Sequence, residues 1–411
     1  MSVCDHLDLI SVESALAILL ADVSASKEHE LIDLMDADGR VLAQDISSPM
    51  AHPPADNSAM DGYAVQAEDL GAHQWFRISQ RILAGDVAED AIEAGCCARI
   101  MTGAAIPPGT DTVVMQENAE LNDAGWVRFT KPSKAGDNVR LRGEEISQGD
   151  IMLEAGRRLR PADLGLLAGV GIAAVKVKPR LKVALIATGD ELAKPGSPLP
   201  EGHIYESNRY TLTAMLKRLG CTVLDMGLVE DSVGALRAAF VMADQQADLV
   251  VTTGGVSVGE ADFCRTVLDE LGSIDLWRLA IKPGKPFAFG SLPDSRYIGL
   301  PGNPVSAMVT FHQLVVPLIQ AMEGESRDEP LILTAKLDQP VRKRPGRMDF
   351  QRGQVYVDDN GALRVIPHRR QGSALLTTVS QSNAYLLLSR DSGKQEVGEQ
   401  VPVLLFDRLL N

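Results

Sequence analysis

The stretch LKVALIATGDE, residues 181–191, decides the fold class of this chain. Its apolar run ends in Gly-Asp-Glu, as expected for a strand that is buried on both faces and then opens into a polar loop. Helix-like segments follow at 208–219, 233–243 and 262–271, and a second buried strand at 248–253 lies among them. Alternating strands and helices predict a three-layer α/β domain with a mostly parallel sheet.

The rest of the chain divides where composition changes. Residues after the first 46 become rich in Gly and Pro with short alternating runs, which predicts a small β domain inserted into a mixed, partly helical domain. Alternation returns near the C-terminus and predicts a small β barrel or sandwich, of which we prefer the barrel. The predicted domains are the discontinuous mixed domain 1–46 with 143–178, the inserted β domain 47–142, the α/β domain 179–325 and the C-terminal barrel 326–411.

Composition and charge narrow the function classes. The chain has 411 residues and a formal net charge of −15, which argues against a broad nucleic-acid surface because such a surface needs a basic face. No basic signal segment and no uninterrupted apolar run of about 18 residues is present, so we expect neither export nor a membrane span. The five cysteines show no CxxC spacing, which favours free thiols in a reducing compartment. These features predict a cytoplasmic protein.

Four unusual loops follow strands of the α/β domain. In open α/β sheets, ligands bind at the carboxyl ends of the strands, so we expect these loops to gather along one edge. The loops are TGDE at 188–191, TGGVSVGEAD at 253–262, KPGK at 282–285 and PGNP at 301–304.

The glycine-rich loop joins a buried strand to a helix. Its residues Gly254, Gly255, Ser257 and Gly259 allow close backbone approach, and the free N–H groups of the helix start can bind an anion such as phosphate. The alternative is a glycine-rich turn that serves only the chain path.

Acidic and basic side chains stand at the same strand ends. Glu191, Asp231 and Asp262 predict a Mg²⁺ site, because converging carboxylates repel one another unless a cation lies among them. Lys282 and Lys285 can neutralise phosphate or oxyanion charge. Taken singly, each of these acids has an alternative explanation, which is that it caps a helix in contact with solvent and binds no metal. Pro301 and Pro304 predict either a rigid wall of a binding site or a simple strand–helix connector.

Several motifs together resemble the molybdopterin molybdenumtransferases of the bacterial MoeA type, which are related to the E domain of gephyrin. The matching stretches lie in all parts of the chain and cover nearly its full length. They are DNSAMDGYAV at 56–65, RIMTGAAIP at 99–107, VVMQE at 113–117, RGEEI at 142–146, ATGDEL at 187–192, GGVSVGEADF at 254–263, IKPGKPFAFG at 281–290, LPGNPVSA at 300–307 and GRMDFQRG at 346–353.

The resemblance implies an elongated homodimer of four-domain subunits. Its active site lies between the α/β domain of one subunit and the small β domain of the other. The substrates are molybdopterin-AMP and molybdate, Mg²⁺ is the cofactor, and AMP is released as molybdenum binds the dithiolene. The implied partners are the molybdopterin adenylyltransferase and downstream proteins of molybdoenzyme maturation, without nucleic acid or membrane.

The resemblance also carries residue roles onto this sequence. It implies contributions from Asp61 and Thr102 of the β domain and from Ser373 of the last domain. On the α/β side it implies Glu191, Asp231, Asp262, Arg278, Lys282, Pro301 and Pro304. Two positions depart from the family pattern. Arg278 stands where lysine is frequent, and Glu145 stands where aspartate is common, so the geometry at both positions differs from that pattern.

Two other functions compete with this one. An adenylyltransferase that makes molybdopterin-AMP would suit the α/β domain, but it would not need the remaining half of the chain or the DNSAMDGYAV segment. A non-catalytic scaffold would be expected to carry additional interaction segments, which the sequence does not display.

Overall fold

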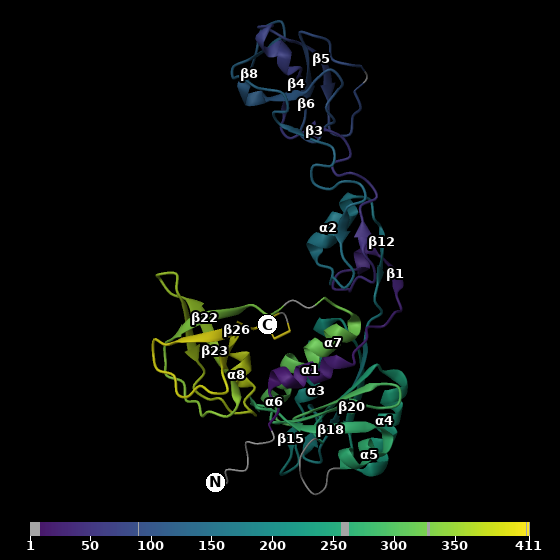
Figure 1. The fold of residues 1–411 in the computed structure, drawn as a ribbon, viewed down its shortest axis with the longest axis vertical. Coiled ribbons are helices and arrows are strands. Elements are labelled where there is room, and N and C mark those ends of the chain that lie inside the picture. Colours follow the sequence, from purple (N-terminus) through teal and green to yellow (C-terminus); the bar gives the residue numbers. More distant parts are fainter. Residues whose placement is uncertain (1–8, 89, 256–262, 327–328, 408, 411) are drawn as a thin grey trace.

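A computed structural model describes residues 9–88, 90–255, 263–326, 329–407 and 409–410. Figure 1 shows an elongated molecule. A β module lies at one end, a small mixed region lies in the middle, and the α/β region with a β barrel beside it forms the other end. The β module and the α/β region therefore lie far apart within one chain.

A six-stranded sheet forms the centre of the α/β region, in the order β16-β13-β17-β21-β20-β18. β13 pairs in parallel with both β16 and β17, and β17 pairs in parallel with β21. β20 is antiparallel to its neighbours β21 and β18. The strands are β13 (Lys182–Thr188), β16 (Thr222–Val229), β17 (Leu249–Thr253), β18 (Ser273–Arg278), β20 (Pro286–Ser291) and β21 (Arg296–Leu300).

Helices cover both faces of this sheet, which confirms the predicted three-layer α/β domain. Alternate residues of β13 belong to different cores: Val183 and Leu185 pack on one face, and Ala184 and Ile186 pack on the other. The apolar run in the sequence is continuous because both faces are buried. The flanking helices are α3 (Asn208–Leu219), α4 (Val233–Gln246), α5 (Phe263–Leu271), α6 (Pro304–Thr310) and α7 (Val316–Glu323).

The last helical segment is long and apolar. A π-helical turn, η5 (Phe311–Val315), joins α6 to α7 into one segment, Pro304–Glu323. By length and composition alone this segment could cross a membrane, but 72% of its most apolar window is buried inside the protein. Such burial is typical of the core helix of a globular domain.

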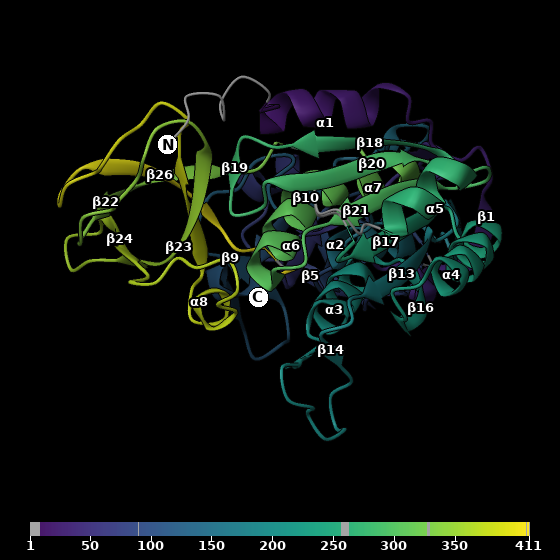
Figure 2. The ribbon, with the colours of Figure 1, turned by 90° about the horizontal axis from the view of Figure 1, so that it is seen from below.

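A closed barrel forms the C-terminal region, as predicted. β23 pairs with both β24 and β25, and β22 and β26 complete the ring between them. A two-residue strand, β19, comes from the α/β region and pairs in parallel with β23, and Figure 2 shows it between the two regions. These elements are β19 (Ile281–Lys282), β22 (Ile332–Leu337), β23 (Met348–Val357), β24 (Leu363–Pro367), α8 (Thr377–Ser380), β25 (Ala384–Leu388) and β26 (Gln400–Leu405).

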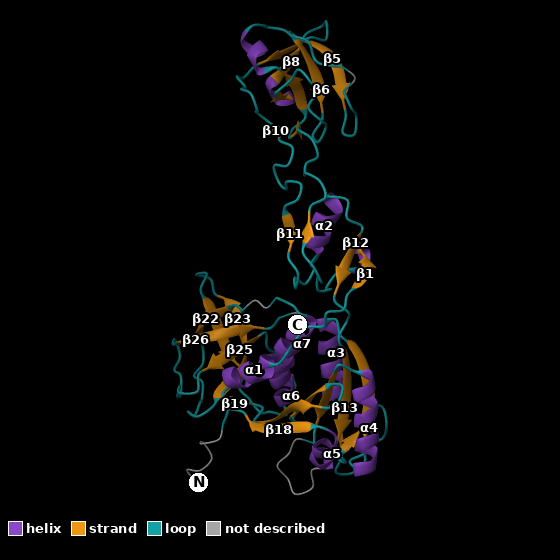
Figure 3. Ribbon diagram, turned by 45° about the vertical axis from the view of Figure 1, so that its right-hand side comes forward, coloured by secondary structure: helices purple, strands orange, loops and turns teal. Residues whose placement is uncertain are grey.

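The β module and the mixed region are connected by two stretches of chain that are mostly loop (Figure 3). A four-stranded sheet in the order β5-β6-β4-β7 forms the module. The mixed region pairs β1 with β12 and β2 with β11, so segments from before and after the module meet there. The elements are β1 (Glu30–Asp33), β2 (Ile46–Ser47), β3 (Asn57–Ser58), β4 (Gly62–Val65), β5 (Arg77–Ile82), β6 (Cys96–Ile100), β7 (Thr112–Met115), β8 (Ala119–Leu121), β9 (Val127–Phe129), β10 (Val139–Arg140), β11 (Ile151–Leu153), α2 (Pro161–Gly169) and β12 (Ala174–Val177).

The first helix, α1 (Val12–Ala21), does not pack in the mixed region. Its buried residues Val12, Ala15 and Leu19 belong to the same core as α3, α6 and α7 of the α/β region. The sequence had grouped residues 1–46 together, because an amphipathic helix shows that it has an apolar face and not which core receives that face. The bounds of the four domains stay a prediction.

Candidate functional site

The carboxyl ends of the parallel strands lie at one edge of the α/β sheet. β13, β16, β17 and β21 run in the same direction, so Thr188, Val229, Thr253 and Leu300 end at that edge. β18 is antiparallel to β20, which is itself antiparallel to β21, so Arg278 ends there as well. The loops singled out from the sequence therefore leave the sheet at a common edge, as expected for a ligand site.

Acidic side chains converge at this edge. Burial raises the pKa of Asp231, and the negative charges of Asp190 and Glu191 raise it further. The three carboxylates are thus close enough to repel one another. Glu191 also folds back over its own loop, where a Cβ atom on Gly189 would lie 2.7 Å from Glu191 Oε2.

A complete metal cage is not formed by the part of the chain that the structure describes. Within those residues no group of three or more acidic, histidine or cysteine side chains is arranged to hold a metal ion. Asp262, the third predicted metal ligand, lies outside the described residues, as do Ser257 and Gly259. Glu191 and Asp231 are therefore the two predicted ligands whose place the structure gives.

The glycines at the end of β17 are required by packing. Gly254 and Gly255 have φ values of +88° and +66°, in the left-handed region that favours glycine. A Cβ atom on Gly254 would lie 2.3 Å from the carbonyl oxygen of Thr188, and one on Gly255 would lie 2.5 Å from Cys264 Sγ. For these two residues, the positive φ and the close packing are enough to explain why glycine is present.

Asn208, at the start of α3, links two of the loops and was not among the predicted site residues. Its Nδ2 donates to Thr253 Oγ1 at 2.6 Å and to the carbonyl oxygen of Gly302 at 2.8 Å. Asn208 Oδ1 and Thr188 Oγ1 are buried and have no hydrogen-bond partner within the described structure. Such atoms are costly unless something satisfies them, which is consistent with a polar ligand at this edge.

Basic side chains occupy the turn after β18. The backbone N–H of Leu279 donates to the carbonyl oxygen of Lys285 at 2.7 Å, which closes the turn. Lys282 Nζ lies 3.0 Å from Asp349 Oδ2 of the barrel. Arg278 is an exposed residue at the end of β18. The turn therefore places positive charge at the carboxyl-end edge of the sheet on the side of β18, whereas Asp231 follows β16 on the opposite side.

The PGNP loop meets the last domain. Pro304 is at the first position of α6, and Pro301 precedes the turn that leads into it. The backbone N–H of Val305 donates to the carbonyl oxygen of Ser373 at 2.9 Å. Two predicted residues, Pro304 and Ser373, are thus brought together from different regions of the chain.

Asp61 and Thr102 form a separate cluster in the β module. Asp61 Oδ1 accepts hydrogen bonds from Thr102 N at 2.7 Å and from Thr102 Oγ1 at 2.8 Å. These bonds, with the nearby charge of Arg99, lower the pKa of Asp61 despite a small opposing effect of burial. Because the module and the α/β region lie at opposite ends of the molecule (Figure 1), one chain does not bring this pair to the Asp231 edge.

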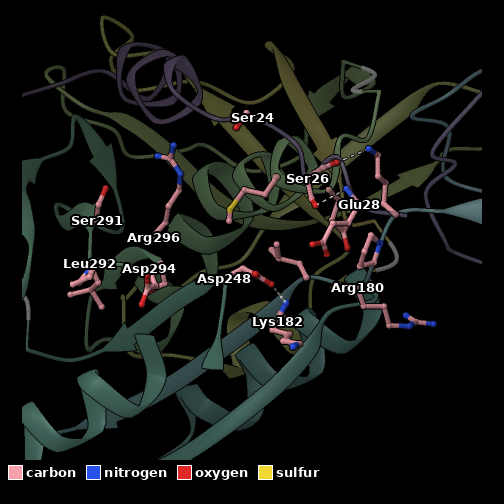
Figure 4. Close-up of a pocket in the computed structure, with 17 residues that line it drawn as sticks. Ser24, Ser26, Glu28, Arg180, Lys182, Asp248, Ser291, Leu292, Asp294 and Arg296 are labelled. Atoms are coloured by element: carbon pink, nitrogen blue, oxygen red, sulfur yellow. Dashed lines mark hydrogen bonds between the residues drawn. The ribbon is translucent and has the colours of Figure 1, made fainter. Parts of the chain in front are cut away.

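A large cavity of the α/β region lies elsewhere. It has a volume of about 570 Å³ and is lined by Lys182, Asp248 and Arg296, at the amino ends of β13, β17 and β21 (Figure 4). Lys182 N donates to Asp248 Oδ2 at 2.7 Å across its wall. The amino ends of the strands are opposite to the edge where the predicted residues gather, so this cavity is not the candidate site.

The arrangement at the carboxyl edge suits an anionic ligand accompanied by a cation. Carboxylates such as Glu191 and Asp231 provide the hard oxygen ligands that Mg²⁺ prefers. Lysine and arginine side chains along the same edge can bind phosphate or another oxyanion. The described residues offer this binding chemistry, and none of the predicted roles requires a covalent nucleophile.

Comparisons with known proteins cover the whole length of the chain. Residues 10–171 match the MoeA N-terminal region (domain I and II), residues 184–321 match a probable molybdopterin binding domain, and residues 334–406 match the MoeA C-terminal region (domain IV).

Individual relatives and solved structures point to the same family as these matches. A molybdopterin molybdenumtransferase of Haemophilus influenzae is 43% identical over 98% of this chain and 100% of its own length. One from a Nostoc species is 34% identical over 94% of this chain and 92% of its own. A crystal structure of a molybdopterin biosynthesis MoeA protein from Pyrococcus horikoshii superposes with a TM-score of 0.82, at 28% identity over 97% of this chain and all of that one. The chain therefore belongs to the MoeA family of molybdopterin molybdenumtransferases, which are transferases of molybdenum cofactor biosynthesis.

Proposed function

We propose that this protein inserts molybdate into adenylylated molybdopterin and releases AMP in a Mg²⁺-dependent reaction. The observation that carries the proposal is that Asp190, Glu191 and Asp231 lie close together at the same edge of the sheet at which β18 ends in Arg278. Mutually repelling carboxylates are the arrangement expected where Mg²⁺ binds, with substrate phosphates as its further ligands.

The described residues have distinct roles in this proposal. Glu191 and Asp231, with Asp262, would hold Mg²⁺, which supplies positive charge to the phosphate oxygens when it is bound. Lys282 and Arg278 bind the anionic groups, phosphate or molybdate, by charge and hydrogen bonds. Asn208 holds the Thr253 hydroxyl and the Gly302 carbonyl group in place, so that both loops present a fixed surface to the ligand.

The Asp61–Thr102 pair joins this site from a second subunit. Asp61 and Thr102 lie at the far end of their own chain, whereas a homodimer can place the β module of one subunit over the α/β edge of the other. The ionised carboxylate of Asp61 is then held by Thr102 facing the substrate. The site is complete only in the dimer.

The cellular setting follows from the substrates. The protein acts in the cytoplasm, takes its adenylylated substrate from molybdopterin adenylyltransferase, and passes the finished cofactor to proteins that mature molybdoenzymes.

The test is AMP release by the purified protein given molybdopterin-AMP and Mg²⁺, with and without molybdate. We expect molybdate-dependent release that Asp231→Ala reduces about 100-fold, because loss of a metal ligand costs at least as much as loss of its supporting groups. Asp269→Asn is the matched control, since Asp269 is an exposed acid on α5 that pairs with Arg265 of its own helix at 3.5 Å.

Other outcomes would contradict the proposal in different ways. AMP transfer from ATP to molybdopterin would favour the adenylyltransferase function. Substrate binding without turnover, together with normal cofactor synthesis in cells that carry Asp231→Ala, would favour a scaffold.

A further inference from the structure

The Lys282 ammonium is held by a carboxylate from another region of the chain. Lys282 ends β19, which comes from the α/β region, and Asp349 lies beside it in β23 of the barrel. The two residues are register partners in this parallel pair, and Lys282 Nζ lies 3.0 Å from Asp349 Oδ2. A carboxylate–ammonium bond of this length is a charge-assisted hydrogen bond.

The two partners differ in exposure. The side chain of Asp349 is 3% exposed, whereas that of Lys282 is 42% exposed. Asp349 is therefore the fixed partner, and Lys282 reaches out from it toward solvent at the carboxyl edge of the sheet. An ammonium group has three N–H donors, and one bond to Asp349 leaves the group able to bind an anion as well.

Asp349 is itself fixed by its surroundings. Gln351 Nε2 donates to Asp349 Oδ2 at 3.0 Å. Lys343 is a nearby buried cation, and its Nζ donates to the carbonyl oxygen of Ser392 at 3.1 Å. Burial lowers the pKa of Lys343, the charge of Asp349 opposes that effect, and the charge of Lys282 adds to it, so the three charged groups lie close together.

The charges of Lys282 and Lys343 explain why a carboxylate at position 349 is needed to hold the Lys282 side chain. Asp349 adds a negative charge near two lysines that repel each other, and of these two Lys282 is the one whose side chain reaches solvent. Without the carboxylate, the long Lys282 side chain would lose its anchor and would have to be ordered again each time an anion binds.

We infer that Asp349 is a positioning residue for the reaction, which holds the Lys282 ammonium at the substrate edge for an oxyanion. The inference rests on the proposed function, because it takes Lys282 as a ligand of molybdate or phosphate. It also assigns the barrel a role in the site: the barrel supplies the group that orients a side chain of the α/β region.

A double-mutant cycle tests whether Asp349 acts through Lys282. The four proteins are the wild type, Asp349→Asn, Lys282→Met and the double variant, each assayed for molybdate-dependent AMP release. We expect Asp349→Asn to lower the rate about tenfold, as for loss of one hydrogen bond to a charged group. We expect no further loss when it is added to Lys282→Met. The matched control is Asp338→Asn, which removes a barrel carboxylate paired with Arg364 and should leave the rate unchanged.

A second measurement needs no turnover. Acetylation of Lys282 at a fixed pH, followed by mass spectrometry, should be several-fold faster in Asp349→Asn than in the wild type, because the Lys282 nitrogen is then no longer held in its charge-assisted bond to the carboxylate. It should be unchanged in Asp338→Asn. If Asp349→Asn does not fold, the wild-type protein still gives an answer, since Lys282 should react more slowly than the exposed Lys131.

Each result has a definite meaning. Equal losses from Asp349→Asn in both backgrounds, or no loss at all, would overturn the inference, as would equal acetylation rates of Lys282 and Lys131. If the wild type shows no AMP release, the proposed function fails. The affinity of the same four proteins for molybdate is then measured by calorimetry. A loss of affinity caused by Asp349→Asn only in the protein that keeps Lys282 supports the inference, and any other pattern overturns it.

Discussion

The carboxylate of Asp61 and residue Thr102 are joined by two hydrogen bonds to a single oxygen, from the backbone N–H and from the hydroxyl of Thr102. Both bonds favour the charged form of the acid, and the pKa of Asp61 accordingly lies below its ordinary value. A β-module carboxylate that is fixed and ionised in this way is suited to a role in which its charge, rather than a proton, is used.

Thr102→Val should raise the pKa of Asp61. The substitution removes the hydroxyl donor and keeps the backbone donor, so the charged form loses part of its stabilisation. If the reaction requires ionised Asp61, the fall in kcat/KM on the acidic side should begin at a higher pH than in the wild type. The measurement is the pH profile of AMP release, with the Asp61 carboxyl titrated by NMR.

Thr102→Ser is the control for that experiment, because serine keeps the hydroxyl. Its profile should match the wild type. A shifted carboxyl titration in Thr102→Val with an unmoved activity profile would mean that Asp61 ionisation does not limit the reaction.

Mixed dimers should recover activity if two subunits share each site. Asp61→Asn and Asp231→Asn should each inactivate a homodimer. A heterodimer of the two variants has one site with both defects and one site with neither, so its activity should return to about half that of the wild type. The measurement is AMP release by heterodimers purified with two different affinity tags.

The contradicting result for the mixed dimer is a preparation that stays as inactive as its parents. That result would place both residues in a site within one chain or in separate steps. Heterodimers of wild type with Asp269→Asn, purified in the same way, establish the activity of an undamaged preparation.

Asn208→Leu should weaken both the fold and the site. It leaves Thr253 Oγ1 and the carbonyl oxygen of Gly302 without their donor, so we expect a loss of about 1–3 kcal/mol in the free energy of unfolding. Urea unfolding measures this loss, and AMP release should fall as well because two loops of the edge lose their link. Asn360→Leu, in a turn of the barrel, is the control. Unchanged activity in a destabilised Asn208→Leu protein would restrict Asn208 to a structural role.

Arg158 should hold the mixed region to the α/β region. Its guanidinium donates to the carboxylates of Glu323 and Glu325, and all three side chains are almost fully buried. Arg158→Met leaves two buried acids facing each other, so we expect a loss of about 3–5 kcal/mol in the free energy of unfolding. Denaturant unfolding measures it, and small-angle scattering should show a changed distribution of intramolecular distances. Arg128→Met is the control, because its ion pair with Glu120 is exposed. Equal losses in both variants would argue against a buried joint.

The α/β region could be predicted in detail because its local signals agree with its packing. The apolar run before Gly189 is a strand buried on both faces, and Gly220, with φ +94°, ends α3 where the sequence placed a helix stop. The prediction that the four loops share one edge of the sheet followed from the parallel direction of the strands alone. Local pattern and tertiary structure point to the same answer at these positions.

Other features depend on contacts that no local pattern displays. Asn208 at a helix start looks like an ordinary cap, and only the folded chain shows its side chain reaching Thr253 and Gly302. Asp349 is 67 residues from Lys282, and their pairing requires β19, which lies in the chain between two strands of the α/β sheet, to join the barrel instead. The placement of α1 on the α/β core was missed for the same reason.

The pairing of β1 with β12 also has a consequence for the order in which the chain becomes structured during synthesis. Glu30–Asp33 must wait for Ala174–Val177, about 140 residues later in the chain, before it has a neighbour. At about 5–20 residues per second, a ribosome needs roughly 7 to 30 seconds to make that stretch. The inserted β module can complete its own sheet within this interval. It is therefore assembled before the mixed region into which it is inserted.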